Sequence, residues 1–424
     1  MPDDSNRLQR AHIVLILLLS TATFFEGYDF ILLNLVLPYL RKDFGLSLLQ
    51  TGYAASAIAA GTIAAFFVMR LGDTLGRRAM LLWTVVGYTV ATGLTAATTD
   101  VFGFVLLQFL ARVFLVAEWG ISTVILAEEL PAAKRGIGIS IVQGAAGVGG
   151  VVGSALFPLV ARVSLGWRAM YLIGLAPLVL VFFLRTRMAE TRRYAALREA
   201  TPEPPGWTDV LARPYRKKLA VVAMLWFFMY LGYTPIMTFW TSFAMNDRGL
   251  TPQQISLVVA IAFTLGLSGF VVAGKLMDAW GRRPTSALFF ALGSFATAAA
   301  FMGPPSVWAM GLSLLVLIFF ATAYLALCAT FTAELFPTRL RASAAAWTNN
   351  TLGRMGMVLA PTLVGLLAER LAGVSRASPS GLGPAVAVLG LAPLVCAALV
   401  LAFLPETRNR ELEEISSASQ TPLG

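Results

Sequence analysis

Cysteine, histidine and charge are all scarce in this chain of 424 residues. Its two cysteines, Cys328 and Cys396, lie in apolar stretches and match neither a disulfide framework nor a metal site. The single histidine, His12, cannot supply a zinc site or a catalytic triad. Only 13% of the residues are charged, whereas soluble domains have about 25%. These absences exclude a soluble protein, and we expect no enzyme activity, no metal and no cofactor.

Apolar residues are abundant instead, at 58% of the chain. They fall in runs of about 20 residues, the length needed to cross a bilayer. The first run continues past Glu26 and Asp29 to Pro38, which is too long for a signal peptide, so we interpret it as a retained span. Twelve spans are expected, at residues 11–38, 48–70, 79–98, 101–127, 136–161, 167–185, 217–245, 252–276, 285–303, 306–333, 342–369 and 384–404.

The net charge of +10 is interpreted as an excess of Lys and Arg in cytoplasmic loops, not as a nucleic-acid-binding surface. The richest basic stretch, residues 187–216, is expected to be a cytoplasmic linker between two sets of six spans. Residues 1–186 would form an N-terminal six-helix bundle. Residues 217–424 would form a C-terminal bundle with a short cytoplasmic tail. Both termini are then expected in the cytoplasm, with the protein integral to the inner cell membrane.

The two sets of spans contain the same motifs in the same order. Arg70–Arg78 reads Arg-Leu-Gly-Asp-Thr-Leu-Gly-Arg-Arg, and Lys275–Arg283 reads Lys-Leu-Met-Asp-Ala-Trp-Gly-Arg-Arg. Ala127–Pro131 and Ala333–Pro337 form a second related pair. The offsets are 205 and 206 residues. Two motifs at nearly one offset indicate a duplication, and parallel halves imply a pseudo-two-fold axis along the membrane normal.

These motifs resemble the major facilitator superfamily over essentially the whole chain. Gly274–Arg283 fits that family's cytoplasmic loop signature at every fixed position, whereas the first half has Met69 where the opening glycine is expected. The resemblance implies an all-α membrane protein. Its twelve transmembrane helices would form two pseudo-symmetric six-helix bundles around a central cavity.

A finer resemblance lies in the first and fourth spans. Glu26–Phe30 and the segment from Arg112 to Gly136 are similar to the metabolite:proton symporters and the related carboxylate and aromatic-acid proton symporters. That similarity implies import of an organic acid with protons. The fifth span is rich in glycine but lacks the Gly-Pro dipeptide of the family's antiporters, which argues against drug efflux. Its glycines, expected to allow close helix packing, are Gly144, Gly147, Gly149, Gly150 and Gly153.

Charged residues inside apolar spans are the sharpest functional signal, because each costs about 2.5–3.5 kcal/mol on insertion scales. Asp29 lies about 14 Å from the outer end of its span, and Arg112 lies about 16 Å deep in the fourth span. Equal depth predicts that they meet, and a carboxylate whose partner alternates between Arg112 and a substrate is a proton-coupling device. The alternative is a static ion pair. Glu26 shares the helix face of Asp29, and Glu118 is either a second proton site or the cap of a polar cluster.

Arg354 lies near the middle of the eleventh span and is the candidate receptor for a substrate carboxylate, since its planar fork binds carboxylates bidentately. Trp347, Asn350 and Arg354 stand at i, i+3 and i+7, which is one face of an α-helix. The alternative is an internal counter-ion for Glu26 or Asp29.

Further polar side chains are candidates for contact with a solute. Gln143 and Asn349 occupy matching positions in the two halves, and Tyr230 and Tyr233 belong to an aromatic stripe on the seventh span. Each of these residues either binds the solute or packs between helices.

Charge pairs at the cytoplasmic turns are expected to act as conformational gates, because alternating access needs two packings of the halves. The alternative is that the basic residues only anchor the topology. The expected gate residues are Asp73, Arg77, Arg78, Glu128 and Arg135 in the first half and Asp278, Arg282, Arg283, Glu334 and Arg339 in the second.

Together these patterns predict a proton-driven symporter that imports a small organic anion, either a monocarboxylate or an aromatic acid. Its partners would be the solute, protons and the lipid bilayer, with no nucleic acid, and the protein would be a monomer. One alternative is a proton-coupled exporter of drugs or metabolites. Another is a membrane sensor, which would need an extra-membrane effector domain.

Overall fold

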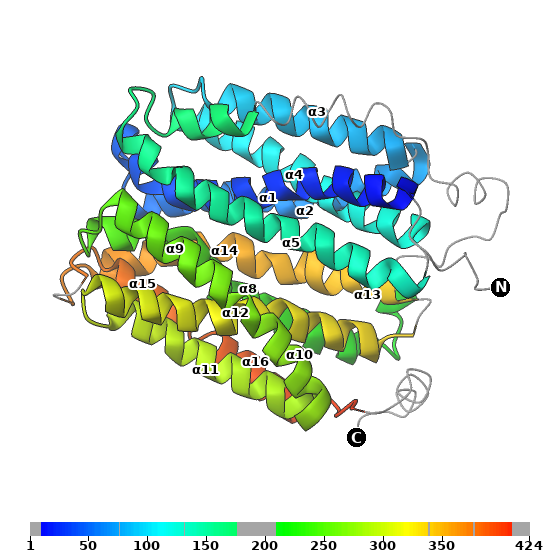
Figure 1. Cartoon of the computed structure of the whole chain (residues 1–424). Coiled ribbons are helices and arrows are strands. Elements are labelled where there is room, and N and C mark those ends of the chain that lie inside the picture. Colours follow the sequence, from blue (N-terminus) through cyan, green and yellow to red (C-terminus); the bar gives the residue numbers. More distant parts are fainter. Residues whose placement is uncertain are drawn as a thin grey trace. The chain divides into compact units, whose positions relative to one another are not determined.

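The computed structural model describes residues 10–75, 77–130, 132–175, 209–337, 340–375 and 378–408 (Figure 1). Within these ranges the elements are helices, and the contacts between them define two compact units. Unit 1 contains residues 10–44 and the described part of 57–175. Unit 2 contains residues 45–56 and the described residues from 209 onward. Nine helices of the described ranges are long and apolar enough to cross a membrane, and there are also shorter apolar helices at Ala79–Thr95 and Gly144–Val160.

The helices of unit 1 match the first five expected spans. A sixth helix begins at residue 168 and is described only to residue 175, so most of the expected span at 167–185 lies outside the described residues. The named elements are α1 (Arg10–Asp43), α2 (Leu48–Leu75), α3 (Arg77–Thr95), α4 (Val101–Glu129), α5 (Ala132–Leu156) and the 3-10 turn η2 (Phe157–Ala161).

Unit 2 begins with a short 3-10 turn, η3 (Asp209–Leu211), after which the helices follow the expected spans. Residues 45–56, which include the first turns of α2, also belong to this unit and pack against α14 (Arg354–Leu371). The remaining elements are α8 (Arg216–Asn246), α9 (Pro252–Gly266), α10 (Ser268–Trp280), α11 (Arg282–Met302), α12 (Val307–Leu335), α13 (Arg341–Ala345), η5 (Ala346–Gly353), α15 (Leu382–Leu389) and α16 (Pro393–Phe403).

Three expected spans of unit 2 are not regular helices. The span at 252–276 is interrupted between α9 and α10, where a Cβ on Gly269 would lie 1.8 Å from the carbonyl oxygen of Phe319. The span at 384–404 is interrupted before Pro393, whose nitrogen has no hydrogen to donate. The span at 342–369 contains the π-helix η5. The apolar pattern locates these spans but does not show the interruptions.

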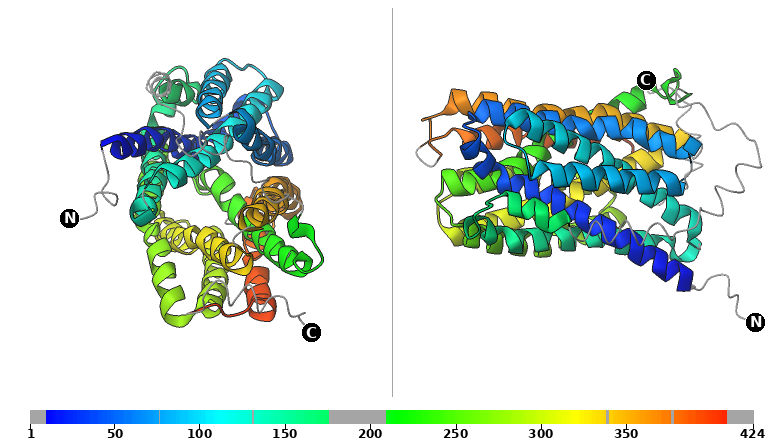
Figure 2. Two further views of the ribbon diagram at one scale, coloured as in Figure 1. Left: turned by 90° about the vertical axis from the view of Figure 1, so that its right-hand side faces the viewer. Right: turned by 90° about the horizontal axis from the view of Figure 1, so that it is seen from above.

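Close contact between α1 and α5 is the main packing feature of unit 1 (Figures 1 and 2). A Cβ on Gly27 of α1 would lie 1.8 Å from the carbonyl oxygen of Ala146. A Cβ on Gly149 of α5 would lie 1.8 Å from the carbonyl oxygen of Phe24. The two backbones therefore touch, as small residues allow in membrane proteins.

Replacing Gly149 by alanine is expected to destabilise the protein by about 1–3 kcal/mol or more, because the added methyl group meets backbone that cannot move aside. The matched control on the same helix is Gly144→Ala, where an added Cβ has no atom within 4 Å and should be tolerated. Thermal unfolding of the purified protein in detergent checks both. Equal melting temperatures for the two variants would contradict this packing.

An acid at the end of the first helix of each unit holds the segment before that unit's last span. In unit 1, Asp43 accepts a hydrogen bond from Trp167 Nε1 at 2.8 Å and forms an ion pair with Arg168 at 3.6 Å. In unit 2, Asp247 accepts hydrogen bonds from Ser378 and, at 2.7 Å, from Ser380. Arg168 and Asp43 therefore have a structural role within unit 1.

The position of Met69 is explained by a glycine on the neighbouring helix. A Cβ on Gly120 of α4 would lie 2.0 Å from the terminal methyl group of Met69 on α2. The large side chain therefore fills the space left by Gly120. The family glycine is replaced on one helix, and a glycine on the facing helix accommodates the change.

Candidate functional site

Three ionisable side chains expected to couple protons are buried inside unit 1. Asp29 on α1 is 2% exposed, Arg112 on α4 is 7% exposed and Glu118 on α4 is 6% exposed. The Asp29 carboxylate interacts electrostatically with Arg112, and its Oδ1 atom has no hydrogen-bond partner. The structure therefore brings Asp29 and Arg112 together across the first and fourth spans. Glu26, also on α1, is half-buried.

Tyr88 on α3 is a member of this group that the sequence analysis missed. Its side chain is 2% exposed, and it interacts with Asp29, Arg112 and Glu118. An uncharged tyrosine in an apolar span has no large insertion cost, so charge patterning gave no signal. Tyr88 makes the group a connected polar cluster of two acids, one base and one hydroxyl.

The close packing of α1 determines where Asp29 lies. The preceding residue, Tyr28, donates a hydrogen bond to the carbonyl oxygen of Met170 at 2.7 Å. A Cβ on Gly153 or Gly174 would come within 3.2 Å of the Tyr28 ring, so these glycines make room for it. The guanidinium carbon of Arg112 lies 5.8 Å from the ring centroid of Phe30, the residue after Asp29. Both neighbours of Asp29 are therefore held by side chains or backbone of unit 1.

The expected anion receptor lies inside unit 2. Arg354 is 8% exposed and begins α14, beside Tyr230 of α8. The Tyr230 hydroxyl donates a hydrogen bond to Asn349 Oδ1 at 3.0 Å. Trp226 stacks on Tyr230 with the ring centroids 5.7 Å apart, and its Nε1 donates to Thr332 at 2.9 Å. A cation, a hydroxyl, an amide and two aromatic rings thus meet in one place, which is the chemistry that an aromatic carboxylate needs.

The expected common face of Trp347, Asn350 and Arg354 is wrong for this segment. The i, i+3, i+7 rule holds for an α-helix, whereas residues 346–353 form a π-helix. The Arg354 amide donates to the carbonyl oxygen of Asn349, five residues earlier. In this π-helix the Arg354 amide thus bonds to Asn349, whereas in an α-helix it would bond to Asn350.

The other residues expected to contact the solute are half-buried or have side chains outside the described part of the structure. Tyr233 lies near Tyr230 on the same helix and is half-buried. Trp347 and Asn350 are half-buried residues of the π-helix. The side chain of Gln143 lies outside the described part of the structure.

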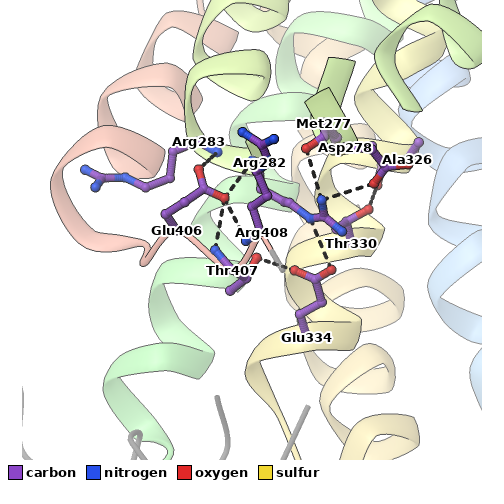
Figure 3. A network of polar contacts seen from close by, with 10 residues as sticks. All are labelled: Met277, Asp278, Arg282, Arg283, Ala326, Thr330, Glu334, Glu406, Thr407 and Arg408. Carbon is purple, nitrogen blue, oxygen red and sulfur yellow. Dashed lines mark hydrogen bonds and ion pairs between the residues drawn. The ribbon is translucent and has the colours of Figure 1, made fainter. Parts of the chain in front are cut away.

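The expected gate of the second half is a network around Arg282 (Figure 3). The Arg282 guanidinium contacts Asp278 Oδ1 at 3.1 Å and Glu334 Oε1 at 3.4 Å, and donates to the carbonyl oxygen of Met277 at 3.0 Å. Arg283 donates instead to the carbonyl oxygen of Leu401. Among the other expected gate residues, Arg339 and the side chains of Asp73, Arg77, Arg78, Glu128 and Arg135 lie outside the described part of the structure.

Glu406, which follows the last helix, completes this network and was not expected from the sequence. Its carboxylate accepts hydrogen bonds from the backbone amides of Arg282 at 2.8 Å and Arg283 at 3.0 Å, and so caps α11 (Figure 3). Gly281 precedes them with φ of +109°, and a Cβ there would lie 2.6 Å from Glu406 Oε2. The glycine of the loop motif is thus needed both for its backbone conformation and for room beside Glu406.

The pKa of Glu406 reflects two opposing effects. Partial burial raises the pKa, but hydrogen bonds from the backbone amides of Arg282, Arg283, Arg408 and Thr407 outweigh it, so the pKa lies below its usual value. A carboxyl whose pKa is lower in the folded protein stabilises the fold above its unfolded pKa, about 4.3. That stabilisation is lost as the pH falls through the folded pKa.

Glu406→Gln is therefore expected to destabilise the protein at pH 7 by about 1 kcal/mol and so to lower its melting temperature, because the amide loses the negative charge and one of the two acceptor oxygens. The difference from the unchanged protein should shrink as the pH approaches 4 and below, because Glu406 is then protonated. Melting temperatures of both proteins, taken from pH 7 down to below pH 4, measure this difference. Asp278→Asn is the control, since the Asp278 side chain is 78% exposed and its ion pair should contribute little. A difference that did not depend on pH would rule out the charge of Glu406 as the cause.

The family model described as Major Facilitator Superfamily matches residues 19–361 and 222–421 of the chain. The chain belongs to this superfamily. Its architecture agrees: it is similar to the crystal structure of the D-xylose-proton symporter with a TM-score of 0.78 and 19% sequence identity, over 93% of this chain and 98% of that one. The chain is therefore a membrane transporter with the major facilitator fold, and not an enzyme.

Relatives among well-described proteins carry small organic acids or related solutes. The chain is 25% identical to the putative niacin/nicotinamide transporter NiaP of Bacillus subtilis, over 92% of this chain and 95% of that protein. It is 27% identical to the 4-hydroxybenzoate transporter PcaK of Pseudomonas aeruginosa, over 83% of this chain and 86% of that protein. The resemblance to the carboxylate and aromatic-acid transporter branches is thereby confirmed.

Proposed function

We propose that this transporter is a proton-coupled symporter that imports a small organic anion, a monocarboxylate or an aromatic acid, by alternating access. The observation that carries the proposal is the buried carboxyl of Asp29, 2% exposed, with Arg112 near it and one oxygen without a hydrogen-bond partner. A buried acid of this kind is a proton site, because the carboxyl is neutral when Arg112 is engaged elsewhere and charged when Arg112 faces it. Glu118 and Glu26 are the further candidates for the proton.

An anionic substrate is supported by the buried Arg354 and by the names of the relatives. Arg354 lies beside Tyr230 and Asn349, whose hydroxyl and amide suit a carboxylate, and beside the ring pair of Tyr230 and Trp226, which suits an aromatic body. The division of labour is then protons in unit 1 and substrate charge in unit 2. We further propose that the protein acts as a monomer in the inner membrane. Both of its termini would lie in the cytoplasm, which the distribution of basic residues favours.

Uptake into proteoliposomes tests the function. The solutes are 4-hydroxybenzoate, an aliphatic monocarboxylate, a neutral sugar and a lipophilic cationic dye, each with and without an inwardly directed proton gradient. Accumulation of an acid that depends on the gradient is the expected result. Accumulation of only the dye, driven by the opposite gradient, would instead make the protein an exporter and leave Arg354 as an internal counter-ion.

A further inference from the structure

The π-helix η5 contains two adjacent asparagines, Asn349 and Asn350, immediately before Arg354. π-Helices are rare, and where they occur they are frequent at functional sites. Here the segment sits between ordinary α-helical turns, α13 and α14. The π-helix sets which residue accepts the hydrogen bond from the Arg354 amide, since that residue is five positions back instead of four.

The acceptor of the Arg354 amide is therefore Asn349, and the side chain of Asn349 is bonded as well. Asn349 Oδ1 accepts the Tyr230 hydroxyl at 3.0 Å, and its backbone oxygen accepts the Arg354 amide. The Thr351 hydroxyl also donates to the carbonyl oxygen of Ala346, five residues earlier, at 3.0 Å. In an α-helix the acceptor of the Arg354 amide would be Asn350, which carries the same side chain.

The chain is held firmly on the C-terminal side of this segment. After the π-helix, α14 is fixed to α8, because a Cβ on Gly356 would lie 2.1 Å from the carbonyl oxygen of Phe227. At the end of the π-helix, a Cβ on Gly353 would lie 2.5 Å from both Trp226 Cβ and the carbonyl oxygen of Thr348. Glycine at this position permits the backbone to change conformation. A change of register would therefore have to be taken up by the residues before Gly353, while α14 stays in place.

We propose that residues 346–353 convert between a π-helix and an α-helix during transport, and that Asn350 replaces Asn349 beside Tyr230 and Arg354. In the π form, the Tyr230 hydroxyl is bonded to Asn349. In the α form, Asn349 turns away, Tyr230 exchanges its partner, and Asn350 supplies the amide. Two identical neighbours keep an amide next to Arg354 in both forms, so neither form leaves the arginine without a polar neighbour. The role in transport rests on the proposed function, whereas the existence of two registers does not.

Disulfide cross-linking in protein without added solute tests for the two registers. Cys328 and Cys396 are first replaced by alanine, because both are buried and Cys328 lies near Tyr230. Three double-cysteine variants are then made, in which Tyr230→Cys is combined with Asn349→Cys, with Asn350→Cys or with Leu352→Cys. Leu352 is the control, since it is 38% exposed and lies two residues before Arg354, on the opposite face in either register. Both asparagine pairs should cross-link at least tenfold faster than the control.

A pair at Asn350 that forms no faster than the control pair would overturn the proposal, because Tyr230 would then meet only Asn349, its partner in the π-helix. The role in transport is tested by Asn350→Ala. It is expected to slow uptake about tenfold or more, as Asn349→Ala should, whereas a rigid π-helix predicts no effect at position 350. If the unchanged protein accumulates no acid, the proposed function fails, and the cross-linking result still decides whether two registers exist.

Discussion

Replacing Asp29 by asparagine is expected to abolish accumulation of the organic acid and to leave exchange of the acid across the membrane. Asparagine keeps the size of the side chain but cannot bind or release a proton. One proton carried with each acid molecule couples about 1.4 kcal/mol per pH unit to transport, enough for about tenfold accumulation. In the variant the proton gradient therefore no longer drives uptake of the acid. The accumulation ratio should fall to unity while labelled acid inside still exchanges with unlabelled acid outside.

The variant keeps the size of the side chain, so Asp29→Asn opens no cavity. It does remove the negative charge that faces the buried Arg112, and the melting temperature shows how much stability this costs. Asp100→Asn is the matched control, because Asp100 is an exposed cap of α4 and asparagine is an equally good cap. The measurements are gradient-driven uptake, counterflow and the melting temperature of each variant. Normal accumulation by Asp29→Asn would move the proton to Glu26 or Glu118, and the corresponding glutamine variants identify which.

Much of the fold follows from the sequence because crossing a bilayer imposes a simple rule. Each span needs about 20 apolar residues whose backbone groups form hydrogen bonds within the span. Runs of this length can be recognised in a single sequence. Charged residues inside the spans can be recognised in the same way. Asp29, Arg112 and Arg354 stand out because placing each charge in lipid costs free energy. The interruption between α9 and α10 and the π-helix η5 are different, because no apolar pattern marks them, and a close backbone contact at Gly269 accompanies the first.

Side chains without a large insertion cost, or outside the spans, were harder to find. Tyr88 is an ordinary residue of an apolar helix until the fold places Asp29 beside it. Glu406 stands in a polar segment after the last helix, and its role appears only when its carboxylate meets the start of α11. The clasps at Asp43 and Asp247 do have a signal in the sequence that was missed: each acid begins an Asp-x-Gly-Leu-Ser/Thr segment, at an offset of 204 residues. This third repeat agrees with the duplication of the two halves.

Replacing Arg354 by lysine is expected to weaken binding of an organic anion about 10- to 100-fold. Lysine keeps the positive charge but loses the planar fork that binds both carboxylate oxygens, and a hydrogen bond to a charged group contributes about 1.5–3 kcal/mol. Binding of 4-hydroxybenzoate and of 4-hydroxybenzamide to the purified protein separates the charge from the ring. The acid should lose affinity. The neutral amide, which cannot form the bidentate ion pair, should change little.

The comparison of acid and amide distinguishes an anion receptor from a structural arginine. If Arg354 only supports the bundle, lysine will disturb Tyr230 and Asn349 and both ligands will be weakened equally. Arg370→Lys is the control on the same helix, because Arg370 is exposed in the last turn of α14 and should affect neither ligand. Unchanged affinity for the acid in Arg354→Lys would place the anion site elsewhere. Selective loss would instead explain why an arginine, 8% exposed and costly to bury, is retained beside an aromatic pair.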